Sequence, residues 1–190
     1  MSEENRIRDD LHYVRSVVDR AGRARNPAAI YFLWAVISFF GYAIIDYDPE
    51  KTGAYWAVAG PVGGVLSAIL GIRGARRAGQ VSEREGVQEL LHWSGLFVAI
   101  LLLVPFVMRG HSPPEELPRI ILLLVALAYW TSGVHRDRRL LPVAGAMAAL
   151  FLFSVVAPDT PWLWTITGAA MAGSLGAAGA IAAARARRAG

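Results

Sequence analysis

Six long apolar stretches separated by short polar gaps constrain the fold of this sequence more than any other feature. A transmembrane helix needs roughly 20 apolar residues to cross a hydrocarbon layer about 30 Å thick, and stretches of this length are too long for buried strands. The sequence therefore predicts an all-α integral membrane protein with six transmembrane helices. The predicted spans are residues 28–47, 54–72, 90–108, 118–134, 140–156 and 162–184.

Basic residues are unevenly distributed among the gaps. Of the 19 Lys and Arg residues, all but Lys51, Arg109 and Arg119 lie before the first span, in the second or fourth gap, or after the sixth span. Loops rich in Lys and Arg stay on the cytoplasmic side of a membrane. We therefore expect a multi-pass protein of the bacterial inner (plasma) membrane, with both termini cytoplasmic and the spans paired as three outward-pointing helical hairpins. The same placement accounts for the pI of about 9.8 without a nucleic-acid partner.

The chain divides into a leading segment, residues 1–26, and a transmembrane bundle, residues 27–190. Apolar residues in the leading segment recur at helical spacing and form one stripe, which predicts a cytoplasmic amphipathic helix. The stripe includes Ile7, Leu11, Val14 and Val18. Its cover could be the lipid bilayer surface, the cytoplasmic loops, a second copy of the chain or another protein, so these residues are candidates for partner binding.

Small residues recur every fourth position in the second and sixth spans. Small side chains let helix backbones approach closely, and this packing drives helix association in lipid. We expect these two helices to lie centrally in the bundle or at an interface between copies, and the third span to face lipid. The candidate packing residues are Gly60, Gly64, Gly168, Ala172 and Gly176.

The sequence offers little catalytic chemistry. It has no cysteine, and no charged residue lies in the middle of a span, where such a residue usually marks an ion path or a proton relay. Asp46 lies at the outer end of the first span and is interpreted as a hydrated interfacial carboxylate. We predict no catalytic residue, no enzyme activity and no resident cofactor.

Two histidines are weak candidates for a metal or haem site. His92 opens the third span and His135 closes the fourth, so the two imidazoles are expected at similar depth. Two interfacial histidines with no shared ligand remain the simpler interpretation, because no acidic cluster or metal-binding spacing accompanies them. The prediction is therefore no metal site.

Polar and aromatic side chains gather in the outer halves of several spans. Rings in this zone usually form an aromatic belt at the membrane interface, but they could also line a small pocket for an apolar or aromatic ligand. The pocket candidates are Tyr42, Trp56, Trp162, Trp164, Thr165 and Thr167.

Two short stretches carry a resemblance to other proteins: Asp10-Leu-His-Tyr-Val-Arg15 and Pro27-Ala-Ala-Ile-Tyr-Phe-Leu-Trp34. They resemble a loose group of small bacterial six-span membrane proteins, over roughly the first 45 residues, and the resemblance implies no activity. The layout of six spans is also similar to the substrate-binding subunits of energy-coupling-factor vitamin transporters. The chain departs from that family because the first span has no clear Ala-x-x-x-Ala coupling motif.

Three functional hypotheses remain open at this point. The first is a non-enzymatic membrane protein that acts through a protein partner, or as a homo-oligomer, on its cytoplasmic face. The second is a solute-binding or transport-associated subunit with a pocket in the outer half. The third is an intramembrane haem or metal protein. The sequence does not identify the ligand, the partner or the oligomeric state.

Overall fold

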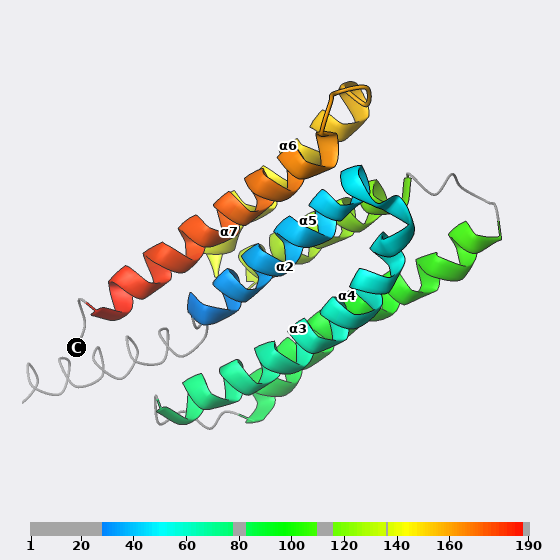
Figure 1. Ribbon diagram of the computed structural model, residues 1–190. Coiled ribbons are helices and arrows are strands. Elements are labelled where there is room, and N and C mark those ends of the chain that lie inside the picture. The colour runs from blue at the N-terminus through cyan, green and yellow to red at the C-terminus, as the bar shows by residue number, and fades with distance from the viewer. Residues whose placement is uncertain (1–27, 78–82, 110–115, 136, 188–190) are drawn as a thin grey trace, which may run out of the picture.

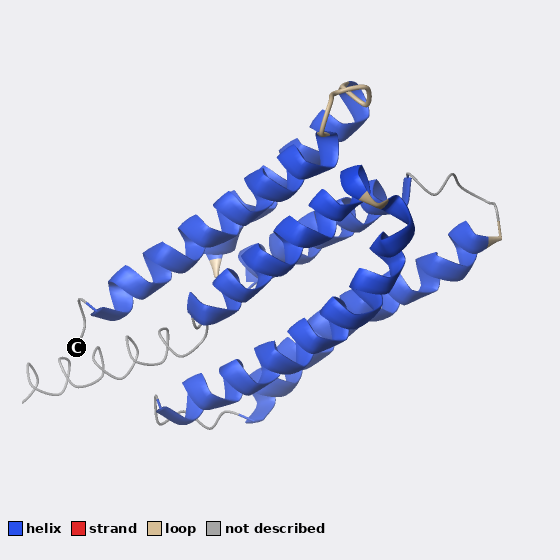
Figure 2. Cartoon of the chain, viewed as in Figure 1, coloured by secondary structure: helices blue, strands red, loops and turns tan. Residues whose placement is uncertain are grey.

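The computed structural model describes residues 28–77, 83–109, 116–135 and 137–187, and in these residues every regular element is helical (Figures 1 and 2). The predicted amphipathic helix over residues 1–26 lies outside the described residues. The helices are α2 (Ala28–Tyr47), α3 (Pro49–Arg77), α4 (Glu83–Met108), α5 (Glu116–His135), the short 3-10 helix η1 (Arg138–Leu140), α6 (Leu141–Val156) and α7 (Leu163–Arg187).

Six of these helical segments are long and apolar enough to cross a membrane, which confirms the predicted all-α class and the number of candidate spans within the described residues. The first span matches α2 at both ends. Helices α3 and α4 begin earlier than their apolar stretches do, at Pro49 and Glu83. Polar turns continue a helix beyond the lipid, and Glu50 lies in the first turn of α3, where the helix dipole favours an acidic residue.

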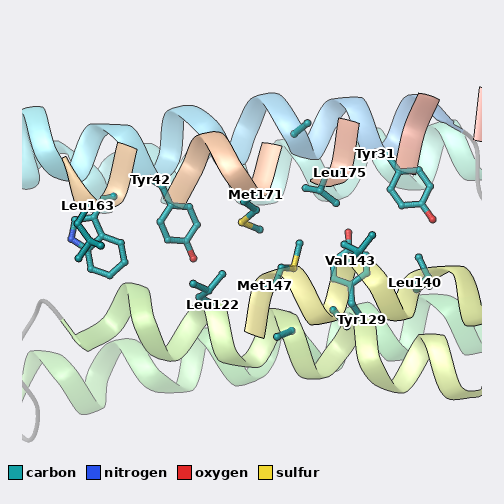
Figure 3. Close-up of a cluster of buried hydrophobic side chains, with 14 residues drawn as sticks. Tyr31, Tyr42, Leu122, Tyr129, Leu140, Val143, Met147, Leu163, Met171 and Leu175 are labelled. Atoms are coloured by element: carbon teal, nitrogen blue, oxygen red, sulfur yellow. The ribbon is translucent and has the colours of Figure 1, made fainter. Parts of the chain in front are cut away.

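Four helices form the core in two layers. Helices α2 and α7 make the most extensive pair and form one layer, and α5 and α6 form the other (Figures 1 and 3). Helix α3 packs on α2, and α4 packs on α5. In the most apolar 18 residues of α2, 33% are buried, compared with 6% in α3 and 0% in α4. Helices α3 and α4 are therefore flanking helices.

Apolar side chains from both layers meet between them (Figure 3). Leu122 and Met147 are completely buried, and Leu175 is 1% exposed. Lipid is as apolar as these side chains, so close packing rather than removal from water holds such a core together. The other large members of the core are Tyr31, Tyr42, Tyr129, Leu140, Val143, Leu163, Trp164 and Met171.

Glycines set the close approach of α2 and α7. A Cβ added to Gly168 would lie 3.0 Å from the carbonyl oxygen of Phe39, and one added to Gly179 would lie 3.3 Å from the carbonyl oxygen of Ala28. Backbones this close leave no room for a side chain, which is the packing that small residues allow in membrane helices.

The long helices alternate in direction, so the first residues of α2 and the last residues of α7 lie at the same end of the bundle (Figure 1). The ends of α3 and α5 and the start of α6 lie there too. We call this end the arginine end, and the arginines of the described helices there are Arg73, Arg76, Arg77, Arg84, Arg138, Arg139, Arg185 and Arg187. The ends of α2, α4 and α6 and the starts of α3, α5 and α7 lie at the opposite end.

Candidate functional site

Side chains from four helices converge near the end opposite the arginines. We call this group the aromatic cluster, and it consists of Tyr42 of α2, Trp56 of α3, Arg119 of α5 and Trp164 of α7. The ring of Tyr42 stacks on that of Trp164 with centroids 6.0 Å apart, and it forms a T-shaped pair with Trp56 with centroids 6.2 Å apart. The guanidinium carbon of Arg119 lies 5.9 Å from the centroid of a Trp164 ring, in a cation–π contact. Three of the six predicted pocket residues thus come together.

The sequence makes room for this cluster at Gly41. A Cβ at this position would lie 2.2 Å from a ring carbon of Trp56, so only glycine lets the indole lie against α2. Tyr42 is the next residue and is 3% exposed. Gly41 therefore makes room for the ring of Trp56, and Tyr42 adds a second ring beside it. These contacts fix α3 against α2 at this end.

Arg119 is the charged member of the cluster. Its Nη1 donates to Oε1 of Glu116 at 2.5 Å, and the side chains of the arginine and the glutamate are 14% and 38% exposed. Its Nε atom is buried and has no hydrogen-bond partner in the described part of the chain. Tyr42 Oη donates a long hydrogen bond of 3.4 Å to the carbonyl oxygen of Pro118, beside Arg119. The position of Arg119 was not predicted from the sequence, where it entered only as a basic residue outside the arginine-rich gaps.

Asp46 joins the end of α2 to the start of α7. Its carboxylate accepts hydrogen bonds from the backbone nitrogen and the hydroxyl of Thr165 at 2.6 and 2.8 Å, and a longer one of 3.4 Å from the nitrogen of Trp164. A carboxylate at a helix N-terminus satisfies free N–H groups and faces the positive end of the helix dipole. Asp46 is half-buried at the end of α2, and the start of α7 supplies hydrogen bonds that its interpretation as a hydrated interfacial carboxylate did not include.

The other three predicted pocket residues have separate roles. Thr165 belongs to the Asp46 contact, and Thr167 is fully buried and donates to the carbonyl oxygen of Leu163 at 2.8 Å. Trp162 is 55% exposed and packs on Tyr47, with ring centroids 5.0 Å apart. The backbone φ of Trp162 is 58°, a left-handed conformation that is uncommon for a bulky residue.

An exposed ion pair lies beside the same end. Lys51 donates to the carboxylate of Asp48, and this hydrogen bond lowers the pKa of Asp48. Both side chains reach solvent, so the pair contributes little to stability.

The histidine candidates lie nearer the arginine end. His92 Nε2 is 3.1 Å from the carbonyl oxygen of Ala128 and 3.1 Å from Oγ of Ser132. A carbonyl only accepts, so the hydrogen bond to Ala128 requires the tautomer with the proton on Nε2, and in that tautomer Nε2 has no lone pair for a metal or for the proton of Ser132. His135 is exposed, and no group of three metal-binding side chains occurs among the described residues.

The predicted packing residues divide between two environments. Gly168 faces the backbone of α2, and Ala172 packs against the core. Gly60, Gly64 and Gly176 have no atom within 4 Å of the position that a Cβ would occupy, other than those of their own helix and chain neighbours. The partner-binding candidates Ile7, Leu11, Val14 and Val18 lie outside the described residues.

Comparison with known proteins adds no relative to this description. The chain matches no family model, no curated protein and no solved structure.

Proposed function

We propose that this chain is a non-enzymatic, multi-pass membrane protein that binds a small solute at the aromatic cluster. The observation that carries the proposal is the convergence of Tyr42, Trp56, Trp164 and Arg119 from four different helices. Ligand sites in helix bundles combine apolar and aromatic walls with a few polar groups that orient the ligand. The cluster has this composition, and the 38% exposed Glu116 connects it with the surface.

Ligand-induced stabilisation of the purified protein tests this function. We expect small aromatic solutes, screened with the protein in phosphatidylcholine nanodiscs, to raise the Tm, because a ligand that binds only the folded state stabilises it. Trp56→Ala should abolish the shift, since it removes one wall of the cluster. Trp130→Ala is the matched control, because that indole is 53% exposed and lies outside the cluster. A broad screen without any stabilising compound would contradict the proposal.

The proposed orientation places the arginine end in the cytoplasm. It rests on the basic residues of the gaps and agrees with three outward-pointing hairpins, α2–α3, α4–α5 and α6–α7, whose helices contact each other pairwise. A reporter active only in the cytoplasm should give signal when fused at Gly79 and none when fused at Pro113. The reverse pattern would overturn the orientation and place the aromatic cluster on the cytoplasmic side.

A second candidate function is binding of a protein partner on the cytoplasmic face. The observation that favours it is the gathering of eight arginines of the described helices at one end, which is also the end where α2 begins (Figure 1). A polar, cationic surface of this kind suits an acidic partner. Replacing Leu11 and Val14 with Glu should abolish partner capture and leave membrane insertion intact. Unchanged capture in the double variant would exclude the leading segment as the binding element.

A further inference from the structure

Two buried polar atoms lack hydrogen-bond partners among the described residues: Oγ1 of Thr52 and Nε of Arg119. Native proteins leave few such atoms unsatisfied, and each one calls for a partner such as water, an ion or a ligand. Both atoms can donate a hydrogen bond, and the arginine also carries a positive charge. An acceptor would satisfy both atoms, and an anionic acceptor would also match the charge of the arginine.

The two atoms lie at the same end of the bundle and are connected through the aromatic cluster. Thr52 is in the first turn of α3, one helical turn before Trp56, and Arg119 is in the first turn of α5 (Figure 1). Trp56 meets Tyr42, whose hydroxyl donates to the carbonyl oxygen of Pro118, the residue before Arg119. The two donors therefore belong to helices, α3 and α5, that both contribute side chains to the aromatic cluster.

The chemistry of Arg119 narrows the class of ligand. Nη1 of its guanidinium is paired with Glu116, the guanidinium carbon lies 5.9 Å from a Trp164 ring centroid, and Nε is a buried donor without a partner among the described residues. Guanidinium groups recognise carboxylates and phosphates through charge-assisted hydrogen bonds of defined geometry. The rings of Tyr42 and Trp56 would contact an apolar or aromatic body.

We propose that the aromatic cluster binds an anionic oxygen group, a carboxylate or phosphate attached to an apolar or aromatic body, through Arg119 and Thr52. This inference rests on the proposed solute-binding function and specifies its ligand class. A free solute and an anionic lipid headgroup share this chemistry, so the experiment must separate them.

The probes are benzoate and its neutral analogue benzamide, each titrated against the full chain in phosphatidylcholine nanodiscs and followed by tryptophan fluorescence and Tm. A separate arm adds phosphatidylglycerol to the nanodiscs and no solute. We expect benzoate to bind more tightly than benzamide if the ligand is a free solute, and phosphatidylglycerol to raise the Tm if it is a lipid. Either result supports the proposal.

Substitution of the two donors makes the test specific. Arg119→Gln should weaken the response to the anion by roughly tenfold or more, and Arg138→Gln, at the arginine end, should leave it unchanged. Thr52→Val should leave the Tm of the ligand-free protein unchanged or raise it, because an unpaired buried hydroxyl is removed, and should weaken benzoate binding several-fold. If Arg119→Gln does not fold, Arg119→Lys keeps the charge, removes Nε and must show the same loss.

The remaining outcomes overturn the proposal in distinguishable ways. Equal binding of benzoate and benzamide, unaffected by Arg119→Gln, would exclude the anion site and leave solute binding at the cluster intact. No binding of either probe and no effect of phosphatidylglycerol would overturn the anion site, and the broad solute screen then decides the solute-binding function separately.

Discussion

The contact between Asp46 and the start of α7 can be tested by Asp46→Ala. The substitution removes two short hydrogen bonds, of 2.6 and 2.8 Å, and a weak one of 3.4 Å. A hydrogen bond to a charged group contributes about 1.5–3 kcal/mol, and loss of a helix cap costs about 0.5–2 kcal/mol. One carboxylate makes all three bonds, so the hydrogen-bond value and the cap value describe partly the same interaction and cannot be added. We expect the free energy of unfolding to fall by about 2–3 kcal/mol, with part of the loss offset by water that reaches the freed N–H groups.

Two measurements check this expectation. Equilibrium unfolding in mixed micelles of lipid and sodium dodecyl sulfate gives the change in free energy, and hydrogen exchange reports the amides of Trp164 and Thr165 separately. Both amides should exchange faster in Asp46→Ala, since their acceptor is gone. Asp159→Ala is the matched control, because Asp159 is exposed in the connection before α7 and its side chain makes no hydrogen bond or ion pair among the described residues. Equal stability of the two variants would refute the role of Asp46 as a cap of α7.

A double-mutant cycle separates the side-chain part of this contact. Thr165→Val removes the hydroxyl that donates to Asp46 and leaves the backbone N–H in place. We expect a coupling free energy of about 1 kcal/mol or more between Asp46→Ala and Thr165→Val, because contacting residues are not additive. Additive effects would mean that the hydroxyl contributes nothing and that only the backbone bonds count.

Gly168→Ala should destabilise the protein by about 1–3 kcal/mol in the same unfolding assay, because its Cβ would press on the backbone of α2. Gly176→Ala should instead raise the stability by up to about 1 kcal/mol. Equal effects of the two substitutions would argue against the close approach of α2 and α7. Ser132→Ala should cost about 1 kcal/mol or less, because His92 Nε2 still donates to the carbonyl of Ala128, and a larger loss would reverse the assigned donor. The absorption spectrum of freshly purified protein should contain no Soret band, because the same nitrogen is protonated; a Soret band that His92→Ala removes would restore the haem hypothesis.

The number of spans could be predicted from the sequence because the thickness of the lipid sets the length of every apolar stretch. Helix α2 has the predicted limits, because Asn26-Pro27 and Asp48-Pro49 disfavour continuation of the helix at its two ends. The start of α3 at Pro49 could not be found by hydropathy, because its first turn contains Glu50 and Lys51 and is helical without being apolar.

The arrangement of the helices could not be predicted in the same way. Lipid-facing and protein-facing residues are both apolar, so hydropathy does not distinguish them. Small residues indicated a central position for both the second and the sixth span. Helix α7 lies centrally, with Gly168 against α2, but α3 flanks the core with Gly60 and Gly64 in open space. An interface between copies at α3 stays a prediction.

The depth of the rings in the aromatic cluster could be predicted from the sequence, but their contacts could not. Tyr42, Trp56 and Trp164 were expected at similar depth because each lies near the same end of its span, but depth does not say which rings touch. The sequence pointed to a role for Asp46 only indirectly, through the lack of a capping residue directly before α7. No Ser, Asp or Asn stands immediately before α7, where Pro161 and Trp162 occur, so a cap had to come from elsewhere in the chain.

Arg119 is the basic residue that topology does not explain. In the proposed orientation, Lys51, Arg109 and Arg119 are the three basic residues on the outer side. Basic residues on that side go against the tendency of Lys and Arg to stay on the cytoplasmic side. Lys51 is 73% exposed and Arg109 is also exposed, so water solvates both at little cost. Arg119 is only 14% exposed, and burying its guanidinium requires compensation beyond one partly exposed carboxylate and one indole face. The missing compensation is the strongest physical reason to look for an anion at this end of the bundle.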